Sequence, residues 1–197
     1  MPVPRPGPSP IAAWTLFSGN DIMNETLPPD TIIDFVSGRP LPNVGAEANR
    51  QAVEAFLVNR KEYAKTDVEV NAAIKLTVGN KPYQSRLDLV VSVDGTRFML
   101  IKCAAGSLGS RERESLAAAR LFDAHQIPLT VVSDGRTAIV LDTVSGKKIG
   151  EGLDAVPTRE EARRHLKATS LQPLPDKRRE KEQLIFRSYD MMNVNVG

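Results

Sequence analysis

The sequence is poor in the residues that build disulfides, zinc sites and base-stacking surfaces. Its 197 residues contain one cysteine, two histidines and one tryptophan, and aromatic residues make up only 5%. A single cysteine cannot form an intramolecular disulfide, and Cys103, His125 and His165 are too few for a conventional zinc site. This composition predicts a reducing, cytoplasmic location.

Long apolar runs and nucleotide-binding signatures are missing as well. No apolar stretch approaches the roughly 18 residues needed to cross a bilayer. The opening MPVPRPGPSP has no apolar h-region of a signal peptide. The phosphate-binding pattern G-x-x-x-x-G-K-[ST] is absent, so translocation along DNA would need another polypeptide. The sequence predicts no membrane partner and no motor activity of its own.

A strong excess of one charge is also lacking. The chain has 26 basic and 24 acidic residues, a net charge of +2, with 41% hydrophobic residues. This balance is ordinary for a soluble globular protein and neither demands nor excludes DNA binding. Two basic runs, around Arg159–Lys167 and Lys177–Lys181, are interleaved with glutamates. That interleaving favours solvated, salt-bridged helix faces over phosphate binding.

Proline is concentrated at one end and divides the chain. Residues 1–43 hold nine of the fourteen prolines and are predicted to form an irregular arm. Residues 44–150 form the predicted core, and residues 151–197 a helical C-terminal extension. Large apolar groups in the arm, at Trp14, Leu16 and Phe17, are expected to pack on the body or on a second subunit. With the alternating C-terminal NVNVG, which suits a sheet edge, they favour a homodimer.

Hydrophobic periodicity predicts an α/β core with a mixed central sheet flanked by helices. Asp94-Gly95 and Asp134-Gly135 predict hairpin turns. Ser110 is predicted to cap a helix, and Thr158 with Glu161 to form a capping box. The expected elements are a helix over 46–60, a strand over 68–78, a turn over 79–85, strands over 86–93 and 96–103, a helix over 111–125, strands over 127–133 and 137–144, and helices over 158–167 and 177–190.

Four stretches share a pattern with one known family. They are DFVSGRPLPN, EANRQAVEAFLV, SRLDLVVSVDGTRFMLIKC and LTVVSDGRTAIVLDTVSGK, spread over residues 34 to 150. In order and spacing they resemble the N-terminal nuclease domain of the type I restriction enzyme R subunit, within the PD-(D/E)XK superfamily. The resemblance implies a restriction-endonuclease-like fold. It also implies metal-assisted phosphodiester hydrolysis, with Mg²⁺ held by carboxylates and a lysine assisting the attacking water.

The active-site pattern of that family is incomplete in this chain. Asp88 matches the family's aspartate and Glu47 its accessory acid. Lys102 stands where the second acidic ligand belongs, and Ala104 where the lysine belongs. An ammonium in that position opposes a divalent ion, and we expect it to pair with Asp88 instead. At about 4 Å and an effective dielectric near 20, two unit charges interact by about 4 kcal/mol. Cys103, on the opposite face of the strand, is expected to be a buried structural thiol.

A catalytic group that has moved to another element would rescue the chemistry. Glu112 or Glu114 on the following helix would then supply the missing carboxylate, and Lys75 the missing amine. The plainer interpretation makes Glu112 and Glu114 a solvated first turn and Lys75 an exposed strand residue. Glu47 would then be a simple surface residue of its helix, and Asp88 a structural residue tied to Arg86 or Lys102.

Three functions therefore stay open. The first is a catalytically degenerate restriction-endonuclease-like module that binds DNA or protein and needs no cofactor. The second is a nuclease that uses Mg²⁺ at Asp88 and Glu47, with Glu112 or Glu114 as the moved ligand. The third is an assembly domain. The partners that the resemblance implies are DNA and other restriction-modification subunits.

Overall fold

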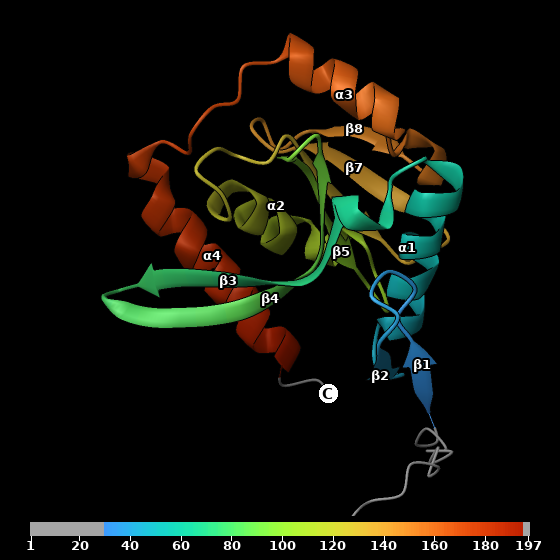
Figure 1. Cartoon of the computed structure of the whole chain (residues 1–197). Coiled ribbons are helices and arrows are strands. Elements are labelled where there is room, and N and C mark those ends of the chain that lie inside the picture. Colours follow the sequence, from blue (N-terminus) through green and yellow to red (C-terminus); the bar gives the residue numbers. More distant parts are fainter. Residues whose placement is uncertain (1–29, 195–197) are drawn as a thin grey trace, which may run out of the picture.

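A six-stranded mixed sheet organises the chain, as seen in the computed structural model of residues 30–194 (Figure 1). The strand order is β3-β4-β5-β6-β7-β8, with β5 and β6 parallel and all other neighbours antiparallel. A second sheet pairs β1 with β2. The elements are β1 (Thr31–Ile33), β2 (Pro40–Pro42), α1 (Glu47–Arg60), β3 (Val68–Val78), β4 (Lys81–Val93), β5 (Thr96–Cys103), α2 (Glu112–Leu121), β6 (Leu129–Ser133), β7 (Ala138–Asp142), β8 (Lys148–Glu151), α3 (Arg159–Ala168) and α4 (Asp176–Val194).

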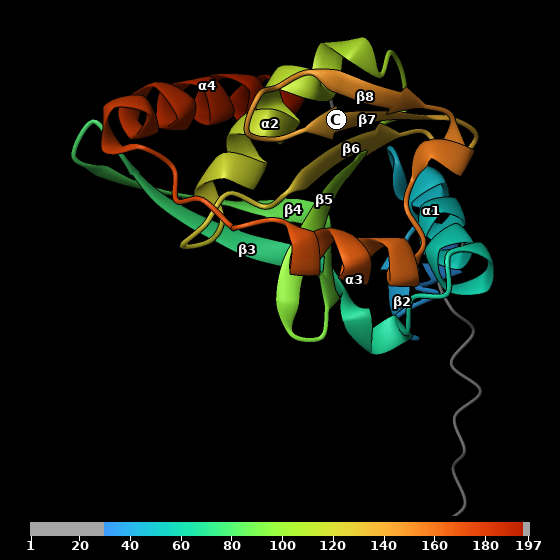
Figure 2. The same cartoon turned by 90° about the horizontal axis from the view of Figure 1, so that it is seen from above.

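Helices cover both faces of the sheet, which confirms the predicted α/β class (Figure 2). On one face, Leu57 of α1 and Ala162 of α3 pack against Leu89 and Ile101. On the other, the alanines of α2 and Phe186 of α4 pack against Val90 and Leu100. Both faces of the central strands are therefore buried, which is why β4 and β5 read as continuous apolar runs. No helix in the described range is long and apolar enough to cross a membrane.

Along the β3–β4 hairpin, the buried side chains switch from one face of the sheet to the other at a single point. Leu89 belongs to the α1/α3 core, whereas Leu87, two residues away, belongs to the α2/α4 core. Regular strand alternation would put both on one face. The irregular position is the Asn71/Asp88 pair: it is missing from an otherwise continuous register, and Asn71 has a φ of 54°. The switch turns the rest of the hairpin toward α4 (Figure 1).

The far part of this hairpin is longer than predicted. The turn expected over 79–85 is confined to Gly79 and Asn80, and β4 begins at Lys81. Pro82 is tolerated because this part of β4 pairs with β3 alone. Tyr83 anchors it, donating its hydroxyl to Asp190 at 2.5 Å and meeting the Phe186 ring edge-on.

Most predicted elements are confirmed, including the Asp94-Gly95 and Asp134-Gly135 hairpins and the Thr158 capping box. Ser110 does not cap α2: its hydroxyl donates to the Ser107 carbonyl, and a turn of 3₁₀ helix precedes Glu112. The helix also stops at Leu121, before His125.

Two further differences lie near the ends of the chain. Strand β8 was not predicted, because its single apolar residue gives no alternation. The prediction that NVNVG adds to a sheet edge is wrong for Asn193 and Val194, because these two residues complete α4. Trp14, Leu16 and Phe17 lie outside the described residues.

The part of the proline-rich arm that the structure describes is attached to the core. Residues 31–42 form the β1–β2 hairpin, which is more regular than the sequence suggested. Two backbone N–H groups after β1 donate to side chains of α1: Phe35 to Gln51 at 2.6 Å, and Val36 to Glu54 at 3.1 Å. This attachment brings the loop after β2 against the mouth of the cleft described next.

Candidate functional site

The candidate site opens where β4 and β5 separate. The two strands pair from Val93/Thr96 as far as Leu89/Ile101, and beyond this point β4 turns away. Asp88 is the first residue past the last pair. Its Oδ2 accepts the backbone N–H of Cys103 at 2.7 Å, in place of a main-chain partner. The diverging strands thus hold the Asp88 carboxylate at a fixed place on the floor of the cleft.

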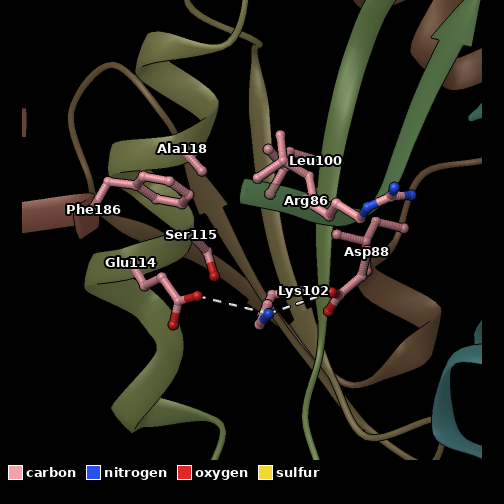
Figure 3. Close-up of a pocket in the computed structure, with 10 residues that line it drawn as sticks. Arg86, Asp88, Leu100, Lys102, Glu114, Ser115, Ala118 and Phe186 are labelled. Atoms are coloured by element: carbon pink, nitrogen blue, oxygen red, sulfur yellow. Dashed lines mark hydrogen bonds and ion pairs between the residues drawn. The ribbon is translucent and has the colours of Figure 1, made fainter. Parts of the chain in front are cut away.

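Lys102 lies between two carboxylates (Figure 3). Its Nζ is 3.3 Å from Asp88 Oδ1 and 3.6 Å from Glu114 Oε1. Strand alternation directs Lys102 to the α2 side of β5, while Cys103 points to the α1 side and is buried. The ion pair predicted between Lys102 and Asp88 is present, and Glu114 of α2 completes it from the opposite side.

The lysine keeps its charge in this position. Burial by itself lowers the pKa of an amine, but the carboxylates of Asp88 and Glu114 outweigh burial and raise the pKa of Lys102 above its ordinary value. The side chain is therefore an ammonium at neutral pH. Glu114 is 2% exposed and also lies 3.8 Å from Arg111. The expectation that Glu114 belongs to a solvated helix turn is wrong.

Glu47 reaches the same cleft from α1, but other side chains hold it. Its Oε1 accepts from Arg50 Nη2 at 2.5 Å and from Gln51 at 2.7 Å. The cleft above it is open to solvent. It is lined by Val44, Ala46, Glu47, Arg50, Asn71, Asp88, Lys102 and Cys103.

Behind Glu47 lies a buried charge cluster that the sequence did not reveal. Arg50 Nη1 is 3.0 Å from Asp34 and 2.8 Å from Glu54, and all three residues are almost fully buried. Burial, followed by the charge of Asp34, raises the pKa of Glu54 to about 7. Since the unfolded chain releases this proton near pH 4.5, the folded state holds it more tightly. The stability that Glu54 contributes is present below that pH and is lost as the pH rises to about 7.

Of the other candidates, Cys103 lines the cleft, whereas Lys75, Glu112 and Ala104 do not. Lys75 is exposed on β3 opposite Gln84, in the far part of the hairpin. Glu151 has the largest effect in raising the pKa of Lys148, the first residue of β8, and the charge of Glu112 adds to it. Ala104, which stands in the place of the family's lysine, is 3% exposed, and its carbonyl accepts from Asn49 Nδ2 at 2.6 Å. Burial raises the pKa of the Cys103 thiol, as expected for a structural cysteine.

The donors present do not fit a divalent metal ion. Mg²⁺ takes oxygen ligands in near-octahedral geometry. Both Asp88 oxygens, however, are engaged by N–H donors, and Lys102 holds one oxygen of Glu114. Among the described residues, no group of three or more His, Cys, Asp or Glu side chains is arranged to hold an ion. The ammonium of Lys102 lies between the carboxylates of Asp88 and Glu114.

The fold and site together define an α/β domain whose cleft, lined by the acids Glu47 and Asp88 and the cations Arg50 and Lys102, opens beside a splayed strand pair. The family described as "Type I restriction enzyme R protein N terminus" matches residues 45–157, more than half of the chain. The chain therefore belongs to this family, as the resemblance implied. Searches of curated proteins and of solved structures found no match. Helices α3 and α4 lie outside the matched range.

Proposed function

We propose that this chain is a catalytically degenerate member of the family, a restriction-endonuclease-like module that binds DNA without cutting it. One observation carries the proposal: the ammonium of Lys102 lies between the carboxylates of Asp88 and Glu114. A positive charge satisfies both acids there without a metal ion.

Electrostatics explains why the amine and a metal exclude each other. A divalent ion bound to Asp88 would lie within about 4 Å of the Lys102 ammonium. At an effective dielectric near 20, the repulsion would be about 8 kcal/mol, twice the value for two unit charges. Metal binding would therefore require Lys102 to leave the cleft and abandon both of its partners. Ala104 provides no second amine to assist a water molecule.

DNA is the partner that the family membership supports. Type I R subunits belong to restriction-modification systems, so other subunits of such a system are the corresponding protein partners. Arg86 lines the pocket that holds Asp88 and Lys102, and Lys75 is exposed nearby on the same face of the β3–β4 hairpin. Such basic groups beside a groove contact phosphates without reading sequence.

A metal-dependent nuclease with a rearranged site is the second candidate. The buried position of Glu114, across Lys102 from Asp88, favours it. If Lys102 moved aside, these two carboxylates would face one cleft, with Lys102 as the amine and Glu47 on the adjoining wall.

Plasmid cleavage and gel retardation separate these functions. The wild-type chain and Asp88→Ala are incubated with supercoiled plasmid and Mg²⁺ or Mn²⁺, and a labelled duplex is run on a gel in parallel. The proposal expects no nicking and a retarded band. Cleavage that Asp88→Ala abolishes would establish the nuclease instead. A chain that neither cuts nor binds DNA, but forms a stable dimer by light scattering, would be an assembly domain.

A further inference from the structure

A second cleft is lined by side chains of α2 and α4. These two helices pack against each other on one face of the sheet (Figures 1 and 2). Four of the cleft's seven lining residues are cations and one is an acid. The lining consists of Arg113, Leu116, Arg120, Arg178, Lys181, Glu182 and Ile185. At neutral pH these side chains carry a net charge of +3, which is unusual in a chain whose overall charge is +2.

The floor of this cleft is a buried pair that fixes its geometry. Arg120, 9% exposed, donates from Nε to the Thr143 carbonyl at 2.9 Å and from Nη1 to Glu182 Oε1 at 2.9 Å. Arg178 donates to the same Glu182 oxygen at 3.1 Å. One carboxylate therefore serves two guanidinium groups and cannot neutralise both.

The rim adds two cations that lack an acidic partner. Neither Arg113 nor Lys181 forms an ion pair with any described residue, and both are exposed. The interleaved glutamates of α4, which favoured a solvated, salt-bridged face, do not pair with Lys181. The apolar side chains of Leu116 and Ile185 line the same cleft and strengthen its field by excluding water.

We propose that the cleft between α2 and α4 is a binding site for a phosphate group. Glu182 is the one acid in the lining and balances one of its four cations. The remaining positive charge favours an anion that offers several oxygen acceptors. Guanidinium groups match phosphate oxygens in geometry as well as charge. The site requires α4, which lies outside the family match, so it is a property of this chain rather than of the matched region.

Two sources offer this chemistry: the DNA backbone, and a free nucleotide or inorganic phosphate. Calorimetry with inorganic phosphate and with a nucleoside monophosphate tests the free ligands. Fluorescence anisotropy with a short duplex at several salt concentrations tests DNA. The test variant is Arg113→Ala/Lys181→Ala, which removes two exposed groups and leaves the buried Arg120–Glu182 pair intact. The matched control is Arg136→Ala, an exposed cation in the β6–β7 hairpin, on the α1 side of the molecule.

We expect the double variant to weaken phosphate binding by about tenfold or more, and Arg136→Ala to leave it unchanged. If the backbone is the source, the same variant weakens DNA binding. The slope of log affinity against log salt then falls by about 0.9 for each DNA phosphate that the variant no longer neutralises. If phosphate binding falls while DNA affinity holds, a free phosphate compound is the ligand.

Two results overturn the site. One is wild-type protein that binds neither phosphate nor nucleotide, and the other is a double variant that binds as well as wild type. Because Asp88→Ala should not affect phosphate binding here, these outcomes are separate from those of the proposed function.

Discussion

Replacing Lys102 with methionine tests the central charge arrangement. The variant keeps the length of the side chain and removes the ammonium. Asp88 and Glu114 then face each other with no cation between them. Two consequences follow: the folded state loses stability, and the cleft gains the capacity to bind a divalent ion.

The structure sets the size of the first effect. At 3.3 and 3.6 Å and an effective dielectric near 20, each contact of Lys102 is worth about 5 kcal/mol before desolvation. Removing one partner of a fully buried pair costs about 3–5 kcal/mol. The Lys102 and Asp88 side chains retain 22% and 21% exposure, so solvent relieves part of this cost. We expect a loss of about 2–4 kcal/mol in the free energy of unfolding.

Urea unfolding and thermal unfolding, each with and without Mn²⁺, measure both effects. The destabilised Lys102→Met should regain stability as Mn²⁺ is added, because an ion that binds only the folded state shifts the equilibrium toward it. The wild type should show no shift, since its ammonium occupies the position. Lys75→Met, the same substitution at an exposed site on β3, is the control and should be neutral in both conditions.

Either of two results would refute the reasoning. If Lys102→Met is as stable as wild type without metal, the contacts to Asp88 and Glu114 contribute nothing. If Mn²⁺ stabilises the wild type as strongly as the variant, the ammonium does not exclude a metal, and the degenerate-site proposal fails.

Three further outcomes are expected. Wild-type stability should fall by up to about 3 kcal/mol between pH 4.5 and 7 because the pKa of Glu54 is raised to about 7, and Glu54→Gln should flatten this decline in urea titrations; an unchanged slope would contradict the assignment. Tyr83→Phe should cost about 1–2 kcal/mol by leaving Asp190 without its hydroxyl donor and should expose the β3–β4 hairpin to hydrogen exchange; unaltered exchange there would count against the anchor. Thr158→Ala should cost about 1 kcal/mol through loss of the capping box, as measured by thermal unfolding, whereas Thr158→Ser should be nearly neutral.

Local sequence patterns predicted much of the fold. Asp94-Gly95 and Asp134-Gly135 fixed two hairpins because type I′ and related turns need residues that tolerate positive φ, and both glycines have it. Ser110 failed as a cap because a 3₁₀ turn occupies the residues before α2 and redirects its hydroxyl. The start of β4 was predicted too late because Pro82 is typical of a turn. Around Pro82, however, β4 has a neighbouring strand on one side only within residues 30–194, and the proline is acceptable there because no second strand needs an N–H from this position.

The sequence alone predicted that Lys102 faces Asp88. The two residues lie on adjacent strands joined by a short hairpin, and strand alternation places them on the same face. Only the tertiary structure decided that Glu114 closes the pair from the far side and that Arg50 holds Asp34 and Glu54 behind the cleft. It also brought the cations of α2 and α4 into one cleft. Those groupings join segments distant in sequence, and packing of helices on the sheet, rather than any local pattern, sets which side chains meet.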